Sequence, residues 1–271
     1  MRSPRILYGT AWKKERTEGL VSQAIASGFR GIDTACQPKH YDEAGVGAAV
    51  AASVRSGLRR EELYLQTKFS PLGGQDPKRI PYDPGAPLAE QVAQSIAVSL
   101  RNLQTDYLDC LVLHSPLRVM RDTETVWQAM QAAFASGTVK QLGISNCYDL
   151  AILKQLHHGA SVKPAVVQNR FYADSGYDVE IRAFCQEHGL SYQSFWTLTA
   201  NPHVLEHQQT QRLAAKYRVT PAQVLFRYLT QIDIVPLSGT TSAAHMREDL
   251  AIFDFTLTEA ERESMGTAIN G

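Results

Sequence analysis

The sequence predicts an α/β protein, a closed (β/α)8 barrel of the TIM-barrel class, from three observations. Strand-like and helix-like segments alternate along the whole chain, which favours βαβ units and a parallel sheet. Eight strand-like segments occur, the number that closes such a barrel. The length of 271 residues is close to the roughly 250 that a barrel uses as one domain. We therefore expect a single domain over residues 1–271 in preference to an open sheet.

The strand-like segments are short and rich in β-branched and aromatic residues. They lie at Arg5–Gly9, Arg30–Asp33, Leu63–Lys68, Tyr107–His114, Lys140–Ile144, Ala165–Gln168, Ser191–Phe195 and Asp233–Pro236. Helical periodicity predicts helices at Glu18–Ser27, Glu43–Ser56, Leu88–Leu103 and Thr123–Ser136. Glycine follows several helical segments, as at Gly28 and Gly189, where a left-handed cap is needed.

Two stretches interrupt the alternation. Residues Pro71–Pro87 are rich in Gly and Pro, and the stretch is too long for an ordinary βα loop. It forms either a lid or wall over a pocket, or an insertion on the surface. Residues Leu205–Gln231 contain two helical segments separated by Thr220 and Pro221, which is typical of a helix cap followed by proline in the first turn.

The composition narrows the classes of function. The 27 basic and 27 acidic residues cancel and the pI is about 7.1, so no general electrostatic argument favours nucleic acid or an anionic membrane. No run approaches the ~18 apolar residues of a membrane span, and the first residues lack the apolar segment of a signal peptide. The four cysteines show no CxxC spacing and the eight histidines no recognisable metal-ligand set. We expect a cytoplasmic protein without a metal site, a monomer or weak homodimer, that acts on a small molecule.

Charged and polar residues stand where the apolar strands end. Asp33, Lys68 and His114 each close a strand-like segment, and Tyr41 lies in the loop after the first of these. Active sites of barrels lie at the carboxyl ends of the strands, so we expect these side chains to gather in a pocket and to transfer protons. The plainer roles are a helix cap for Asp33 and a solvated or structural position for Lys68 and His114.

Three motifs resemble the aldo-keto reductase family, and together they extend over most of the chain. Gly9-Thr10-Ala11-Trp12 is similar to the family's motif after the first strand, Gly28–Ala35 to its Gly-Tyr-Arg-x-Ile-Asp-Thr-Ala signature, and Gly137–Asn146 to its later Gly-x-Val-Arg-x-Ile-Gly-Val-Ser-Asn block. The resemblance implies a barrel enzyme that reduces aldehydes and ketones to alcohols by hydride transfer from NAD(P)H. The hydride has to come from a cofactor, because no side chain supplies one.

The four polar residues can be given roles in this reaction. A free phenol, with a pKa near 10, exchanges protons poorly at neutral pH. An ammonium group at Lys68 is expected to lower the pKa of the Tyr41 phenol, and the Asp33 carboxylate keeps Lys68 charged and oriented. His114 is expected to hydrogen-bond the carbonyl oxygen, while Tyr41 delivers the proton.

His40 competes with Tyr41 for the role of proton donor. Counting back from Glu43 places His40 in the family's tyrosine position, whereas counting forward along the loop indicates a short insertion at Cys36–Lys39. We favour Tyr41 because the chemistry needs a phenol, and an imidazole acid at His40 is the alternative. Trp12 and His40 are expected to contact a hydrophobic aldehyde or ketone.

The resemblance also implies the contacts of a dinucleotide that lies across the mouth of the barrel. No GxGxxG motif follows the first strand, which argues against a Rossmann domain. The matching positions are Ser145, Asn146, Gln168, Phe195, Trp196, Ser238, Gly239, Thr240, Arg247, Glu248 and Asp249. The plainer alternatives are a helix N-cap for Ser145 and Asn146 and core packing for Phe195 and Trp196.

The phosphate end of this site departs from the family pattern. Leu237 stands where many members have lysine, and His245 where an arginine commonly holds the 2′-phosphate. Loss of these cations removes contacts that favour NADP over NAD. We expect NADP(H) on family grounds, with NAD(H) as the alternative and Arg247 as a substitute cation.

Two other functions stay open. A nucleotide-binding regulatory or sensor subunit would use the same barrel with weak or no turnover, since a shared fold does not guarantee a shared function. The altered tyrosine loop is compatible with it, whereas Asp33, Lys68 and His114 argue against it. A lyase or isomerase would need a neutral Lys68, which Asp33 opposes.

Overall fold

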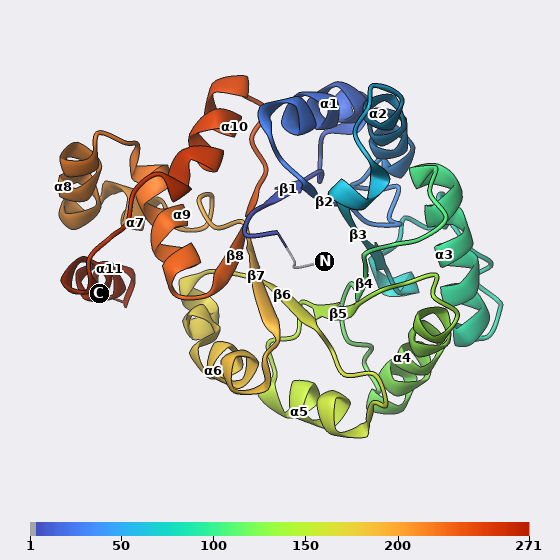
Figure 1. Ribbon diagram of the computed structural model, residues 1–271. Coiled ribbons are helices and arrows are strands. Elements are labelled where there is room, and N and C mark those ends of the chain that lie inside the picture. Colours follow the sequence, from blue (N-terminus) through green and yellow to red (C-terminus); the bar gives the residue numbers. More distant parts are fainter. Residues whose placement is uncertain (1–3, 271) are drawn as a thin grey trace.

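The computed structural model describes residues 4–270 and forms a closed barrel of eight parallel strands (Figure 1). The strands pair in chain order, and β1 closes the ring against β8. Their bounds are β1 Leu7–Gly9, β2 Gly31–Asp33, β3 Tyr64–Phe69, β4 Cys110–Leu113, β5 Leu142–Ser145, β6 Val166–Arg170, β7 Ser191–Phe195 and β8 Ile234–Ser238. The predicted fold class is confirmed.

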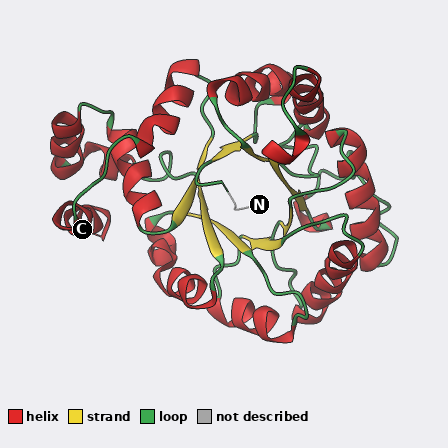
Figure 2. Cartoon of the chain, in the orientation of Figure 1, coloured by secondary structure: helices red, strands yellow, loops and turns green. Residues whose placement is uncertain are grey.

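Helices surround the barrel and cover the outer face of the strands (Figure 2). The ring consists of α1 Thr17–Ser27, α2 Glu43–Arg55, α3 Leu88–Leu103, α4 Met120–Ala135, α5 Leu150–Gly159, α6 Val179–His188, α9 Pro221–Gln231 and α10 Ala243–Leu250. Outside it, next to α9, lie α7 Pro202–Glu206, α8 Gln208–Tyr217 and α11 Glu259–Asn270 (Figure 1). Strands covered in this way are buried on both faces, and β3, β4 and β5 are buried along their whole length.

The predicted helix signals are confirmed at several ends. Gly28 and Gly189 cap α1 and α6 with φ of 118° and 69°, a left-handed conformation that glycine adopts without steric cost. The Thr220 hydroxyl accepts from the Gln223 amide while the Gln223 side chain accepts from the Thr220 amide, and Pro221 fills the first turn of α9. This reciprocal pair satisfies backbone donors that a helix start leaves free.

Most strands differ from the sequence-based bounds by one to three residues at an end, and β3 and β4 show why. β3 continues one residue past Lys68, because Phe69 is buried and pairs with Leu113. β4 begins only at Cys110, since the preceding Asp109 uses its carboxylate to accept from the Leu65 amide (3.0 Å) and to pair with an arginine. Lys68 therefore lies inside a strand rather than at its end.

Helices α2 and α3 approach each other most closely at Gly47. A Cβ atom at this residue would lie 2.0 Å from the Asn102 carbonyl oxygen and 2.8 Å from the Leu103 backbone. No side chain fits there, so glycine is required by packing rather than by a turn. By contrast, a Cβ atom at Gly19 in α1 would meet no atom within 4 Å.

Parallel register brings polar side chains of distant strands to one level. Asp33 on β2 lies opposite Gln66 on β3, and Gln168 on β6 lies opposite Ser145 on β5 and Gln193 on β7. Residues two apart on a strand face the same side, so Gln66 and Lys68 share a face. The upper part of the barrel interior therefore contains amide, carboxylate and ammonium groups.

Candidate active site

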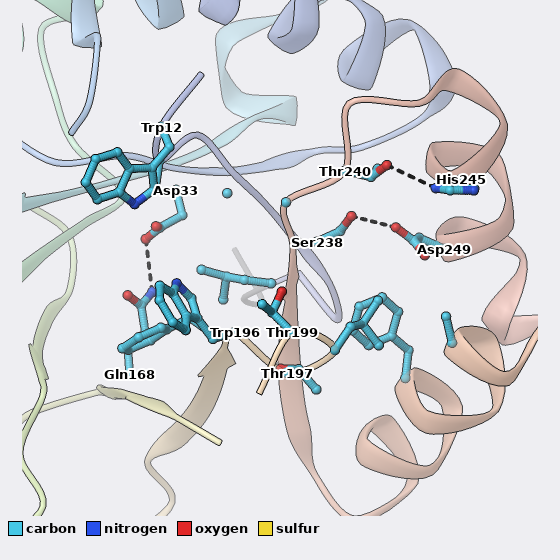
Figure 3. A pocket seen from close by; sticks show the side chains of 18 of the residues that line it. Trp12, Asp33, Gln168, Trp196, Thr197, Thr199, Ser238, Thr240, His245 and Asp249 are labelled. Atoms are coloured by element: carbon cyan, nitrogen blue, oxygen red, sulfur yellow. Dashed lines mark hydrogen bonds between the residues drawn. The ribbon is translucent and has the colours of Figure 1, made fainter. Parts of the chain in front are cut away.

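A cavity of about 640 Å³ opens at the carboxyl ends of the barrel strands. It extends from Trp12, Asp33 and Gln168 to Ser238 and Asp249 (Figure 3). Most of the expected site residues line it: Trp12, Asp33, Tyr41, His114, Ser145, Asn146, Gln168, Phe195, Trp196, Ser238, Gly239, Thr240, Glu248 and Asp249. Lys68, His40 and Arg247 are not among its lining residues.

Lys68 lies directly beneath the cavity and forms an ion pair with Asp33. Its Nζ atom lies 2.7 Å and 2.6 Å from the two carboxylate oxygens of Asp33 and donates to the Thr34 carbonyl oxygen at 2.9 Å. Both side chains are buried. All three ammonium protons are therefore used, and the ion pair is held in one geometry. The arrangement matches the pairing that the sequence predicts.

Tyr41 lies beside this pair and reaches the cavity. Its ring centroid is 5.3 Å from Lys68 Nζ and 6.0 Å from the centre of the His114 ring. Burial, and then the negative charge of Asp33, raise the pKa of Tyr41 above its ordinary value. The expectation that Lys68 lowers this pKa is wrong, because burial of the phenol dominates and the negative charge of Asp33 acts in the same direction. Tyr41 is held as a neutral phenol, the form that can give up a proton.

His40 packs on the rim of the site, away from the lining of the cavity. Its ring centre is 3.8 Å from that of Trp12, and the Trp12 amide donates to the His40 carbonyl oxygen at 2.7 Å. Burial, followed by the charge of Lys39, lowers the pKa of His40. The structure thus brings Tyr41 rather than His40 to the cavity wall.

His114 follows β4 and is oriented by Ser70. The Ser70 hydroxyl lies 2.5 Å from His114 Nδ1. Burial, then the charges of Lys68 and His40, lower the pKa of His114 to about 3, so its imidazole is neutral near neutral pH. If Ser70 donates to Nδ1, the ring proton resides on Nε2, which is then a hydrogen-bond donor. Sequence analysis missed Ser70, although its spacing of two from Lys68 was an available signal.

The segment Pro71–Pro87 supports this corner without lining the cavity. Gln75 donates to the carbonyl oxygens of Cys36 (2.9 Å) and Ser70 (3.1 Å), and the Tyr82 hydroxyl donates to Ser70 at 2.7 Å. The segment gives no support to the expected lid or wall, because none of its residues lines the cavity; most of them are exposed, as expected of a surface insertion, although Gln75 and Tyr82 are buried. The segment ties the loop that carries Tyr41 to the residue that orients His114.

Ser145, Asn146 and Gln168 form one wall of the cavity. Asn146 has a left-handed backbone (φ 50°) and donates from Nδ2 to the His114 carbonyl oxygen at 2.8 Å. The helix cap of α5 is Asp149, which accepts from the Ala151 amide, so the N-cap alternative for Ser145 and Asn146 is wrong. Both residues line the cavity instead, and Asn146 Nδ2 also donates to Ser145 Oγ at 3.2 Å.

Phe195 and Trp196 form the aromatic side of the cavity. Phe195 ends β7 and is half-buried. Trp196 is 48% exposed, and the Arg170 guanidinium lies 4.4 Å from its ring centroid. Core packing is therefore wrong for Trp196, whose indole stands at the mouth of the barrel (Figure 3).

The far end of the cavity lies between β8 and α10. The Ser238 hydroxyl donates to Asp249 at 2.5 Å, and burial raises the pKa of Asp249 to about 6. Thr240 Oγ1 lies 3.4 Å from His245 Nδ1. Lys13, missed by sequence analysis, donates to the Gly239 carbonyl oxygen at 2.8 Å. These contacts fix the loop after β8.

Arg247 does not take part in this end of the cavity. It is exposed on α10 and absent from the lining, so the cavity gives no support to its expected role as a substitute cation, which stays a prediction. Within residues 4–270 no lysine or arginine lines the cavity. In the same residues, no cluster of three or more His, Cys, Asp or Glu side chains suits a metal ion, and no helix is long and apolar enough to cross a membrane.

A closed barrel with an acid, an ammonium, a phenol and an imidazole near the carboxyl ends of its strands places its polar groups where barrel enzymes have their active sites. Residues 6–269 match the model of the aldo/keto reductase family. The chain thus belongs to this family of NAD(P)H-dependent oxidoreductases.

Individual relatives agree with this assignment. An aldo-keto reductase of Mycolicibacterium paratuberculosis is 31% identical over 251 residues, which cover 93% of this chain and 80% of the relative. The aldo-keto reductase family 1 member A1 of Gallus gallus is 28% identical over 295 residues, covering 97% and 85%. A crystal structure of an aldo/keto reductase from Brucella melitensis superimposes with a TM-score of 0.80 at 26% identity, covering 98% and 95%.

Proposed function

We propose that this protein reduces an aldehyde or ketone to an alcohol, with Tyr41 as the proton donor and a nicotinamide nucleotide as the hydride donor. The observation that carries the proposal is the joint position of Tyr41 and His114 on the cavity wall, directly above the buried Lys68–Asp33 pair. A phenol that is kept neutral and an imidazole that is kept neutral can both donate hydrogen bonds to one carbonyl oxygen.

The residues of the cavity suit a nicotinamide nucleotide. Gln168 donates its amide protons to Asp33 and Gln193, which leaves its oxygen to accept from a carboxamide. Ser145 and Asn146 offer further polar groups on the same wall, and Phe195 offers a ring that can stack on the nicotinamide. The bound nucleotide supplies a hydride to the carbonyl carbon.

The side chains supply the rest of the reaction. His114 holds the carbonyl oxygen, and its Nε2–H bond stabilises the negative charge that develops there. Tyr41 transfers its hydroxyl proton to this oxygen, which completes the alcohol. The Lys68 ammonium stabilises the phenolate that forms, and Asp33 holds Lys68 in place. Trp12 and the rim residue His40 form the aromatic surface that contacts the hydrophobic part of the substrate.

NADPH is the proposed hydride donor, and NADH is accepted with little discrimination. The adenosine end of the cavity offers Thr240, His245 and the loop after β8, but also the acidic Glu248 and Asp249. A 2′-phosphate is bound strongly only where charge-assisted contacts surround it. We expect kcat/KM for NADPH to exceed that for NADH by no more than about tenfold, which corresponds to a single such contact.

The test follows the absorbance of NADPH with a panel of aromatic aldehydes. Turnover that depends on the aldehyde supports reduction, whereas tight nucleotide binding without oxidation would assign the protein as a binding subunit. Tyr41→Phe is expected to lose at least about a hundredfold in kcat, because it removes the proton without changing the shape. His40→Ala is the matched control and should keep most of the activity; the opposite ranking would move the proton donor to His40.

A further inference from the structure

A network of three glutamine side chains fills the interior of the barrel beneath the cavity. Gln66 on β3, Gln168 on β6 and Gln193 on β7 are all buried. Gln193 Oε1 accepts from Gln66 at 2.7 Å and from Gln168 at 2.9 Å, and Gln193 Nε2 donates to Gln66 Oε1 at 3.1 Å. Barrel interiors are usually filled by branched apolar side chains. Burial of three amide groups costs free energy unless their donors and acceptors are hydrogen-bonded, so their presence in the barrel interior requires an explanation.

The network ends on Asp33. Asp33 Oδ1 accepts from Gln66 at 2.7 Å and from Gln168 at 3.0 Å, in addition to Lys68 at 2.7 Å. Asp33 Oδ2 is left to Lys68 alone at 2.6 Å. The carboxylate therefore shares its charge between two amides and one ammonium group.

Asp33 also fixes the orientation of the amides. Gln66 and Gln168 each donate one proton to Asp33 and the other to Gln193. Rotating either amide by half a turn would bring its oxygen against the Asp33 carboxylate, so that two acceptors would face each other. The charge of Asp33 thus sets the directions of these hydrogen bonds. Gln193 Oε1 accepts the second proton of both Gln66 and Gln168 and so holds both amides in place.

We propose that Gln66 and Gln193 are positioning residues of the proton relay, which act on Tyr41 through Asp33 and on the nucleotide through Gln168. The amide donors draw the negative charge of Asp33 toward β3 and β6. Less of this charge then opposes the Lys68 ammonium when the Tyr41 phenolate forms. This inference rests on the proposed function and adds two residues that touch neither substrate nor nucleotide.

Gln66→Met is the first test, since methionine has a similar size and no donor. We expect kcat to fall about tenfold, the effect of removing one hydrogen bond to a charged group. The dissociation constant for NADPH, read from quenching of Trp12 and Trp196 fluorescence, should stay unchanged. The solvent isotope effect on kcat should rise, because proton transfer becomes slower relative to other steps. An unchanged kcat in a folded Gln66→Met variant overturns the inference.

A double-mutant cycle tests whether Gln66 acts on Tyr41 through Asp33. In an Asp33→Asn background, Gln66→Met should cause no further loss of kcat, because its path to Tyr41 is already broken. Full additivity would show that Gln66 acts independently of Asp33 and would overturn this part of the inference. Gln91→Met is the matched control: Gln91 is a buried glutamine of α3 that bonds only the carbonyl oxygens of Pro84 and Ala86, and this variant should keep kcat.

Gln193→Met tests the second proposed positioning residue. It also replaces the first test if the Gln66→Met variant does not fold. It should lower kcat and also weaken NADPH binding, because Gln168 loses one of its two acceptors. In the wild-type protein, the side-chain amide protons of Gln66 and Gln168 should exchange slowly with water by NMR, and rapid exchange would contradict the network. If the wild type does not oxidise NADPH, the proposed function fails; if it does and both methionine variants match it, only this inference fails.

Discussion

The charge on each residue of this site depends on its neighbours and on its burial. Lys68 is buried and gives all its donors to Asp33 and Thr34; in the proposed reaction its charge would stabilise a Tyr41 phenolate only as far as Asp33 does not already neutralise it. His114 is kept neutral by burial and by the nearby cations. The proposed chemistry therefore depends on a balance of charge among four groups rather than on one residue with a shifted pKa.

Replacing Lys68 should cost stability as well as activity. Lys68→Met leaves the buried Asp33 carboxylate without its cation, and we expect the free energy of unfolding to fall by about 3–5 kcal/mol. Urea unfolding measures the loss. The double variant Asp33→Asn, Lys68→Met should recover part of it, because no unpaired charge is left. Equal stability of the single variant and the wild type would mean that the pair is not buried as described.

His245 offers a residue-scale test of nucleotide preference. His245 lines the adenosine end beside Thr240, and His245→Arg introduces a fixed cation there. The ratio of kcat/KM for NADPH to that for NADH should rise about tenfold, since one charge-assisted contact to the 2′-phosphate is added. Steady-state kinetics with both nucleotides measure it, and Arg247→Ala, on the exposed side of α10, should leave the ratio unchanged.

Some residues of this site could be predicted from the sequence and others could not, for physical reasons. Asp33 and His114 could be found because a charged or polar group at the end of an apolar strand is unusual. Gln66 and Gln193 could not, since their importance depends on which strands meet across a closed barrel. The direction of the Tyr41 pKa shift was misjudged because the sequence does not show how deeply the phenol is buried or how close the Asp33 carboxylate lies to it.

At the scale of elements, the strands and helices hold the site through close contacts and shared caps. β3 carries Gln66 and Lys68 on one face and continues to Ser70, which orients His114. The stretch after β7, which includes the short helix α7, has no clear periodicity and was not predicted. Periodicity also misplaced the ends of β3 and β4, where tertiary contacts of Phe69 and Asp109 decide the bounds.

Two glycines in helices make a matched test of element packing. Gly47→Ala places a methyl group 2.0 Å from the Asn102 carbonyl oxygen, so α2 and α3 have to separate; we expect a loss of about 1–3 kcal/mol or more from overpacking. Gly19→Ala meets no atom within 4 Å and should stabilise α1 by about 0.5–1 kcal/mol. Thermal unfolding compares the two, and a stable Gly47→Ala variant would contradict the α2–α3 contact.

At the scale of the whole molecule, the alternating pattern of the sequence was sufficient for the architecture. Eight βα units can bury their apolar strands only by closing the sheet and covering it with helices, and the barrel does so with β1 paired to β8. What the pattern could not show is the content of the barrel. Its upper interior is polar, and the buried histidine and carboxylates make global stability depend on pH.

His114 should contribute a measurable acid sensitivity to the global fold. Its pKa is lowered from 6.5 to about 3 in the folded protein. At a pH between these two values, the imidazole is therefore protonated in the unfolded chain but not in the folded protein. Stability should therefore fall as the pH drops below about 6.5, by on the order of 1.4 kcal/mol per pH unit, and level off near pH 3. The difference between wild type and His114→Gln in unfolding at several pH values isolates this effect; a difference that does not change with pH would refute it.

The extension of β3 to Phe69 has a mechanical consequence. The backbone of Lys68 is held on both sides, since Val112 on β4 lies opposite it and its carbonyl oxygen accepts from the Cys36 amide at 3.0 Å. We therefore expect the backbone beneath the cavity to keep its position during turnover. We expect the cavity to open for substrate entry and product release by movement of the loops around its rim, while Asp33 and Lys68 below them keep their positions.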